Sequence, residues 1–91
     1  MTLRAKGVIG QKVIASDGSS VGEVVDLSIS DDWKVEHLVV RLERDVAKAA
    51  GFRFSLRPKG LIPISLVRGF RDYITLGVEG EELYRQIKKA D

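Results

Sequence analysis

The chain has 91 residues, of which 44% are hydrophobic and 31% charged, with a formal net charge of +2 and no cysteine. This composition indicates one small globular domain and excludes a disordered chain and a disulfide framework, while no apolar run approaches the roughly 18 residues of a membrane-spanning helix. A net charge of +2 does not by itself indicate nucleic-acid binding, which requires a basic stripe.

The N-terminal part predicts a β-hairpin. The chain meets Gly7 and Gly10 before any long apolar region, so its start does not resemble a signal peptide, and a cytoplasmic location is expected. The apolar run 7–14 ends in Asp17-Gly18, a pair typical of hairpin turns in which both central residues adopt positive φ. We therefore expect a turn here and a returning strand after it.

The returning strand shows two conflicting patterns. Val25, Leu27 and Ile29 alternate with polar residues, as in a strand with one buried face, but Val21 and Val24 do not share one parity with them. A bulge or bend at residues 22–23 would resolve the conflict, because glycine in a strand often marks such a place.

The next segments predict a second strand and a short helix. Residues 31–34 form an acidic turn, beside which Trp33 is expected to act as a lid on the end of the domain. In the strand 35–42, one face carries Leu38, Val40 and Leu42, and the other carries His37, Val39 and Arg41. Residues 43–50 are rich in helix formers and end at Gly51, which indicates a helical insert of about two turns.

The second half of the chain predicts further strands and a final helix. Residues 52–57 alternate between apolar and basic or polar side chains, a turn is expected at 58–60, and Pro63 in the run 61–64 belongs at an edge or a strand end. The last strand spans 67–76, and an amphipathic helix follows at about 79–90. The whole indicates an all-β fold, a small barrel of five to six strands in residues 3–76, with a helical insert and a C-terminal helix.

Three possible chemical sites are weak. Gly18 and Gly22 match neither a P-loop nor a dinucleotide loop, and a strand follows them in place of a helix. His37 is the only histidine and has no accompanying nucleophile motif, so a structural role is expected. Asp31 and Asp32 lack calcium-loop spacing and are better explained as turn residues. We expect no catalytic residue, no metal and no cofactor.

Two groups of side chains are candidates for partner binding. Residues 46–71 contain no acidic residue. Their basic side chains either face RNA, an anionic membrane surface or an acidic partner, or they are solvated and balanced by nearby glutamates. The candidates are Arg53, Arg57, Lys59, Arg68 and Arg71. A second set is apolar. Its C-terminal members either dock on the domain itself or pair with a second copy or a partner; the set is Val39, Phe52, Phe54, Leu56, Leu83, Tyr84 and Ile87.

The strand motifs resemble those of the PRC-barrel domain, the small β-barrel also found in the reaction-centre H subunit and in the C-terminal half of the ribosome maturation factor RimM. The matching stretches are VIGQKVIASDGSSVGEVVDLSIS, DDWKVEHLVVRL and LIPISLVRGFRDYITL, which together cover about residues 3–76, with 44–59 as the variable part. The resemblance implies an adaptor without catalytic residues, which makes the chain a non-enzyme.

A stand-alone domain of this length is most similar to small archaeal PRC-barrel proteins of the CdpB type. The resemblance implies a cytoplasmic adaptor in cell division, recruited to the division site, that forms a homodimer or pairs with a paralogous PRC-barrel protein. Its implied partner is SepF, the membrane adaptor of the FtsZ ring; DNA binding and membrane insertion are not implied. The alternatives are an RNA- or ribosome-associated module like RimM, whose N-terminal barrel is missing here, and a small-molecule or metal sensor.

Overall fold

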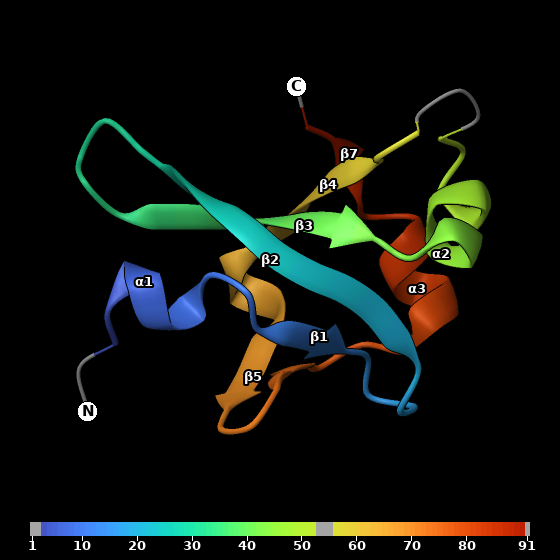
Figure 1. The fold of residues 1–91 in the computed structure, drawn as a ribbon, viewed down its shortest axis with the longest axis horizontal. Helices are drawn as coiled ribbons and strands as arrows, with labels where there is room; N and C mark the ends of the chain where they lie inside the picture. Colours follow the sequence, from blue (N-terminus) through green and yellow to red (C-terminus); the bar gives the residue numbers. More distant parts are fainter. Residues whose placement is uncertain (1–2, 53–55, 91) are drawn as a thin grey trace.

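The computed structural model describes residues 3–52 and 56–90 and consists of short strands with a few short helices (Figure 1). Seven strands lie in these residues: β1 (Lys12–Ile14), β2 (Ser20–Ile29), β3 (Val35–Leu42), β4 (Lys59–Pro63), β5 (Val67–Phe70), β6 (Ile74–Leu76) and β7 (Lys88–Lys89). The helical elements of the same residues are α1 (Ala5–Val8), α2 (Arg44–Ala49), the 3-10 turn η1 (Ile64–Leu66) and α3 (Gly80–Tyr84).

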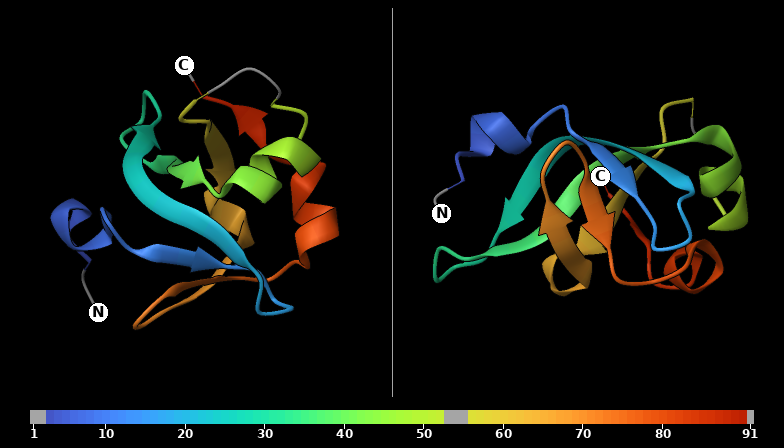
Figure 2. Two further views of the ribbon diagram at one scale, coloured as in Figure 1. Left: turned by 45° about the vertical axis from the view of Figure 1, so that its right-hand side comes forward. Right: turned by 90° about the horizontal axis from the view of Figure 1, so that it is seen from below.

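All the strands belong to one sheet with the order β5-β6-β1-β2-β3-β4-β7. Neighbouring strands are antiparallel except β1 and β6, which are parallel. Within residues 3–52 and 56–90 no ladder joins β5 to β7, so the sheet is curled but open (Figure 2). The expectation of a mostly β fold is confirmed, whereas a closed barrel of five to six strands is not what the structure contains.

Three register shifts account for the conflicting pattern of β2. One lies where β1 pairs with β2, between the pairs Val13–Gly22 and Ile14–Ser20. The other two lie in the β2–β3 ladder, at Val25 and between the pairs Ser28–His37 and Ile29–Val35. Val21 and Val24 are both fully buried, and the shift at Val25 lets Leu27 also pack against the core. Ile29, expected inside, is 55% exposed at the end of the strand. A bulge was rightly expected, but none of these shifts is centred on residues 22–23.

The strand β3 follows its sequence pattern closely. Leu38, Val40 and Leu42 are buried, while His37 and Val39 are half-buried and Arg41 is exposed. β3 pairs with both β2 and β4, and Pro63 ends β4 as expected from its missing N–H. The expected turn at 58–60 is wrong, because β4 already begins at Lys59.

The core is formed by the inner faces of the central strands and by one side of each helix. Its buried hydrophobic residues are Val8, Val13, Ala15, Val21, Val24, Leu38, Val40, Leu42, Val46, Ala47, Ile62, Ile74, Leu76, Leu83 and Ile87. α2 and α3 lie together at one end of the sheet and α1 at the other (Figures 1 and 2).

The last predicted strand and the C-terminal helix both differ from expectation. The strand 67–76 is a hairpin, because β5 and β6 are separate strands that pair with each other. The helix expected at 79–90 ends at Tyr84, and the chain then returns so that Lys88 and Lys89 pair with β4. The short helix at 43–50 is confirmed as α2.

Candidate binding surfaces

An apolar groove opens at the α1 end of the sheet. Its volume is about 270 Å³, and its floor is made by core residues such as Leu38 and Ile74. Its rim carries large hydrophobic side chains that are 37% to 55% exposed: Leu3, Ile29, Val35 and Ile64. Arg4 is the charged residue among the described residues that line it. The groove is therefore a place where the core is accessible from outside.

Ile29 and Val35 of the groove rim lie at the base of the hairpin that joins β2 to β3. This hairpin extends away from the body of the domain (Figure 1). We call residues 30–36 the finger. At its tip, Trp33 has a φ of 66° and is 87% exposed. The expectation that Trp33 covers the end of the domain is therefore wrong, because almost all of its ring faces solvent.

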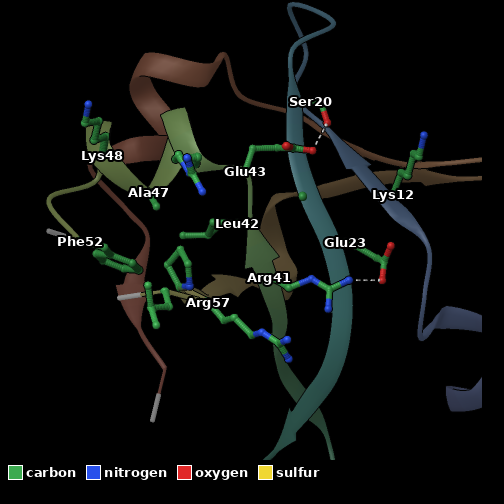
Figure 3. Close-up of a pocket in the computed structure, with 14 residues that line it drawn as sticks. Lys12, Ser20, Glu23, Arg41, Leu42, Glu43, Ala47, Lys48, Phe52 and Arg57 are labelled. Carbon is green, nitrogen blue, oxygen red and sulfur yellow. Dashed lines mark hydrogen bonds and ion pairs between the residues drawn. The ribbon is translucent and has the colours of Figure 1, made fainter. Parts of the chain in front are cut away.

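A second concavity, the cationic cleft, lies at the α2 end of the molecule (Figure 3). It has a volume of about 560 Å³ and lies between β2, the end of β3, α2 and the segment 56–58. Its apolar lining includes Leu42, Ala47 and Phe52, and five basic residues surround this lining: Lys12, Arg41, Arg44, Lys48 and Arg57. The two acidic lining residues are Glu23 and Glu43.

The acidic groups of the cleft are already engaged by neighbours. Arg41 Nη2 donates to Glu23 Oε1 at 2.9 Å, and Ser20 Oγ donates to Glu43 Oε1 at 3.4 Å (Figure 3). Within the described ranges, the ion pairs are Lys34–Asp32, Arg41–Glu23 and Arg85–Glu82. The other four cations of the cleft thus have no carboxylate partner in that part of the chain, which leaves an excess of positive charge over an apolar floor.

The apolar residues selected from the sequence are separated by the structure. Leu83 and Ile87 are 0% and 7% exposed and pack in the domain's own core, the first of the two alternatives for this stripe. Tyr84 and Phe52 are half-buried against that core, Val39 is half-buried on β3, and Leu56 is fully exposed. Phe54 lies outside the described residues. The residues do not form one surface.

The basic residues selected from the sequence are also dispersed. Arg57 lines the cationic cleft, and Lys59 pairs with Arg41 across the β3–β4 ladder. Arg68 packs its side chain against Gly77, and Arg71 lies in the β5–β6 turn. Arg53 lies outside the described residues. Sequence adjacency suggested one patch, but Lys59 lies in β4 and Arg68 in β5, which are far apart in the sheet order, and Arg57 and Arg71 lie outside the strands.

The remaining polar candidates, His37 and Asp17, contact neighbouring serine residues. His37 Nδ1 is 2.9 Å from Ser28 Oγ on the neighbouring strand, and the structural role expected for His37 stays a prediction. Among the residues that the structure describes, no group of three or more His, Cys, Asp or Glu side chains is arranged to hold a metal. Asp17 accepts hydrogen bonds from the Ser19 hydroxyl at 2.6 Å and the Ser19 N–H at 3.1 Å, and these donors lower the pKa of its carboxyl.

Sequence reasoning missed the apolar groove. Its rim residues come from four separate segments, and only the observation that Ile29 and Val35 flank a turn could have drawn attention to them. A scan of the chain against family models and a search of curated proteins found no match. In the described part of the chain, no helix has the length and apolar character needed to cross a bilayer.

Proposed function

We propose that this chain is a non-enzymatic adaptor that acts by binding other proteins. The observation that carries the proposal is the gathering of four exposed hydrophobic side chains around the apolar groove. Small domains seldom leave contiguous apolar surface in water unless another molecule covers it, because its burial is favourable by roughly 25 cal/mol per Å². Covering this groove therefore supplies a driving force for association.

The finer proposal follows the resemblance of the strand motifs to PRC-barrel domains. It is supported by the β1–β2 hairpin with its Asp17-Gly18 turn, the β2–β3–β4 meander and the run from β4 into the β5–β6 hairpin, which lie at the three matching stretches. On this proposal the protein works in the cytoplasm of an archaeon, pairs with itself or a paralogue, and joins a SepF-type adaptor at the division site.

The proposal is tested with purified components. Titration of a SepF-type protein into the chain, followed by calorimetry, is expected to show binding that changes little between low and moderate salt, because apolar burial is insensitive to ionic strength. Two matched variants test self-association through the groove: Val35→Asp at the groove rim should weaken it, and Val39→Asp on β3 should leave it unchanged. Absence of binding by the unmodified chain at high micromolar concentration would exclude this partner.

A second candidate function is an RNA- or ribosome-associated module. The observation in its favour is the cationic cleft, in which four cations have no carboxylate partner among the described residues. Phosphate contacts release counterions, so affinity for an oligoribonucleotide or a ribosomal subunit would fall steeply with salt. Loss of binding on Arg44→Glu together with Lys48→Glu, with the groove variants unaffected, would favour this function over the adaptor.

A further inference from the structure

The backbone at Trp33 is strained, and packing of its side chain within the domain does not offset the strain. A left-handed conformation costs an L-residue roughly 1–2 kcal/mol, and Trp33 adopts it with φ 66°. Its ring is 87% exposed, so contacts within the domain do not offset this cost. Strained positions are often found where the side chain serves a binding function, and tryptophan is among the residues most enriched at the centres of protein interfaces.

The finger and α1 carry opposite charge on either side of the apolar groove. The finger contains Asp31, Asp32, Lys34 and Glu36, three acidic residues and one basic, which gives a net charge of −2. Residues 3–8 contain Arg4 and Lys6 and no acidic residue, a net charge of +2. All six side chains belong to exposed residues, and among residues 3–52 and 56–90 the single ion pair that any of them forms is Lys34–Asp32 at 3.8 Å.

We infer that the groove is covered by a second copy of this chain, an inference that rests on the self-association in the proposed function and assigns it a surface. Two copies that meet groove to groove, about a two-fold axis running along the groove, bring the acidic finger of each against the basic α1 of the other. The same rotation buries the apolar rims against each other and carries Trp33 toward the partner's Arg4, where its ring can stack on the guanidinium.

The charge pattern favours this occupant over the other ones that an apolar groove admits. A two-fold axis across the groove would place like charges together, so the pattern also selects the orientation of the two copies. An anionic membrane would attract Arg4 and Lys6, but it would repel Asp31 and Asp32 at the tip that has to insert. A second copy satisfies the acidic and basic walls simultaneously.

Trp33 is the only tryptophan in the chain, so its fluorescence reports directly on the proposed contact. As protein concentration rises, the emission is expected to move to shorter wavelength and acrylamide quenching to weaken, in step with dimer formation measured by light scattering. Val35→Asp is expected to weaken dimerisation by at least about tenfold, since burying a carboxylate without a partner costs more than the 1.4 kcal/mol to which that factor corresponds. A dimer that leaves the Trp33 spectrum unchanged would overturn the inference.

A charge-swap pair gives the sharpest test. The variant Asp31→Lys/Asp32→Lys has a basic finger beside a basic α1, and the variant Arg4→Glu/Lys6→Glu has an acidic α1 beside an acidic finger, so each should dimerise at least about tenfold more weakly than the unmodified chain. Mixed in equal amounts, the two variants restore opposite charges at both contacts and should form a heterodimer. Circular dichroism of each variant establishes that the fold is kept.

The outcomes separate this inference from the proposed function. If the mixed variants do not associate although the unmodified chain dimerises, the dimer uses another surface, and the inference fails while the adaptor proposal stands. If the chain remains a monomer and Trp33 becomes protected only with a SepF-type protein or with phosphatidylglycerol vesicles, the second copy is the wrong occupant. Heterodimer formation from the swap pair, and from neither variant alone, supports the inference.

Discussion

Gly18 and Trp33 occupy the same position in two hairpin turns that are built alike. The Gly18 N–H donates to the carbonyl of Ala15 at 2.9 Å, and the Trp33 N–H donates to the carbonyl of Ser30 at 2.9 Å. Both residues have positive φ, 87° and 66°. The first turn thus has the residue that this geometry favours, and the second has one that it disfavours.

The first prediction is that Trp33→Gly stabilises the isolated domain. Glycine relieves the left-handed strain of roughly 1–2 kcal/mol, and its greater chain entropy in the unfolded state costs about 0.5–1 kcal/mol. A net gain of up to about 1.5 kcal/mol is therefore expected. Urea denaturation at concentrations low enough to keep the chain monomeric measures it. The matched change Gly18→Ala, which meets nothing within 4 Å but keeps φ 87°, should cost about 1 kcal/mol.

A destabilised Trp33→Gly variant under these conditions would mean that the ring contributes to folding of the single chain. In that case the exposure of Trp33 would no longer point to a partner. The variant Trp33→Ala separates the two effects, because it removes the ring and leaves the Cβ that causes the strain.

The second prediction concerns the close approach of β2 and β3 at Gly22. A Cβ at this position would lie 2.1 Å from the Arg41 carbonyl oxygen, a backbone atom that cannot move without breaking the ladder. Gly22→Ala is expected to destabilise the fold by about 2 kcal/mol or more, in the range of overpacked sites. Gly7→Ala, whose Cβ meets nothing within 4 Å, is the control and should be neutral or slightly stabilising. Equal stability of the two variants would contradict the observed strand register.

The third prediction distinguishes core from surface among the residues that the sequence grouped together. Leu83 is fully buried and Leu56 fully exposed, so Leu83→Ala should cost about 2–5 kcal/mol of unfolding free energy and Leu56→Ala less than about 0.5 kcal/mol. Thermal denaturation of both variants is sufficient. Similar midpoints for the two would show that the C-terminal segment does not pack as described.

The fourth prediction is a pH dependence that arises at the β1–β2 turn. The pKa of Asp17 is lowered, first by the Ser19 hydroxyl and then by the Ser19 N–H, because both donate to the ionised carboxylate. The folded pKa lies below the unfolded one, so this contribution is present above about pH 4 and is lost as pH falls through the folded value. An NMR titration should give Asp17 a midpoint below the value of about 3.9 that an aspartate has in an unstructured peptide.

In Asp17→Asn the side-chain acceptor is kept but no longer titrates, so the loss of stability on acidification should be smaller than in the unmodified chain. Identical acid-unfolding profiles for the two proteins would show that the hydrogen bonds of Asp17 carry no net free energy.

The sequence was most informative where a strand has neighbours on both sides and a regular ladder with one of them. The alternation of β3 gave its buried face correctly because its ladder with β4 has no register shift from His37 to Arg41, which preserves the period of two. In β2 the same reasoning could not place Val24 and Leu27 on one face, because the shift at Val25 changes the parity without a distinctive residue to announce it. Ile29, expected inside, lies exposed at the end of the strand. The sequence could not indicate that the barrel stays open, because pairing between the edge strands β5 and β7 depends on the curl of the whole sheet.

The candidate site was less accessible to sequence reasoning. Leu83 and Ile87 have the spacing of one apolar helix stripe, which by itself fits a core contact and a partner contact equally well. The chain after Tyr84 turns back onto β4, and both residues are buried in the domain's own core. The groove rim joins Leu3, Ile29, Val35 and Ile64, which no local pattern connects. One signal was available in the sequence. The turns 15–18 and 30–33 both have aspartate in third place, but the fourth residue is glycine in the first turn and Trp33 in the second.

The central claim is that this domain acts through the apolar groove and the finger beside it, and hydrogen–deuterium exchange of dilute and concentrated protein tests it most directly. Association is predicted to slow exchange in residues 3–8 and 29–36, with the segments around the cationic cleft, 41–49 and 56–58, unchanged. Slowed exchange at the cleft with none at the finger would contradict the claim.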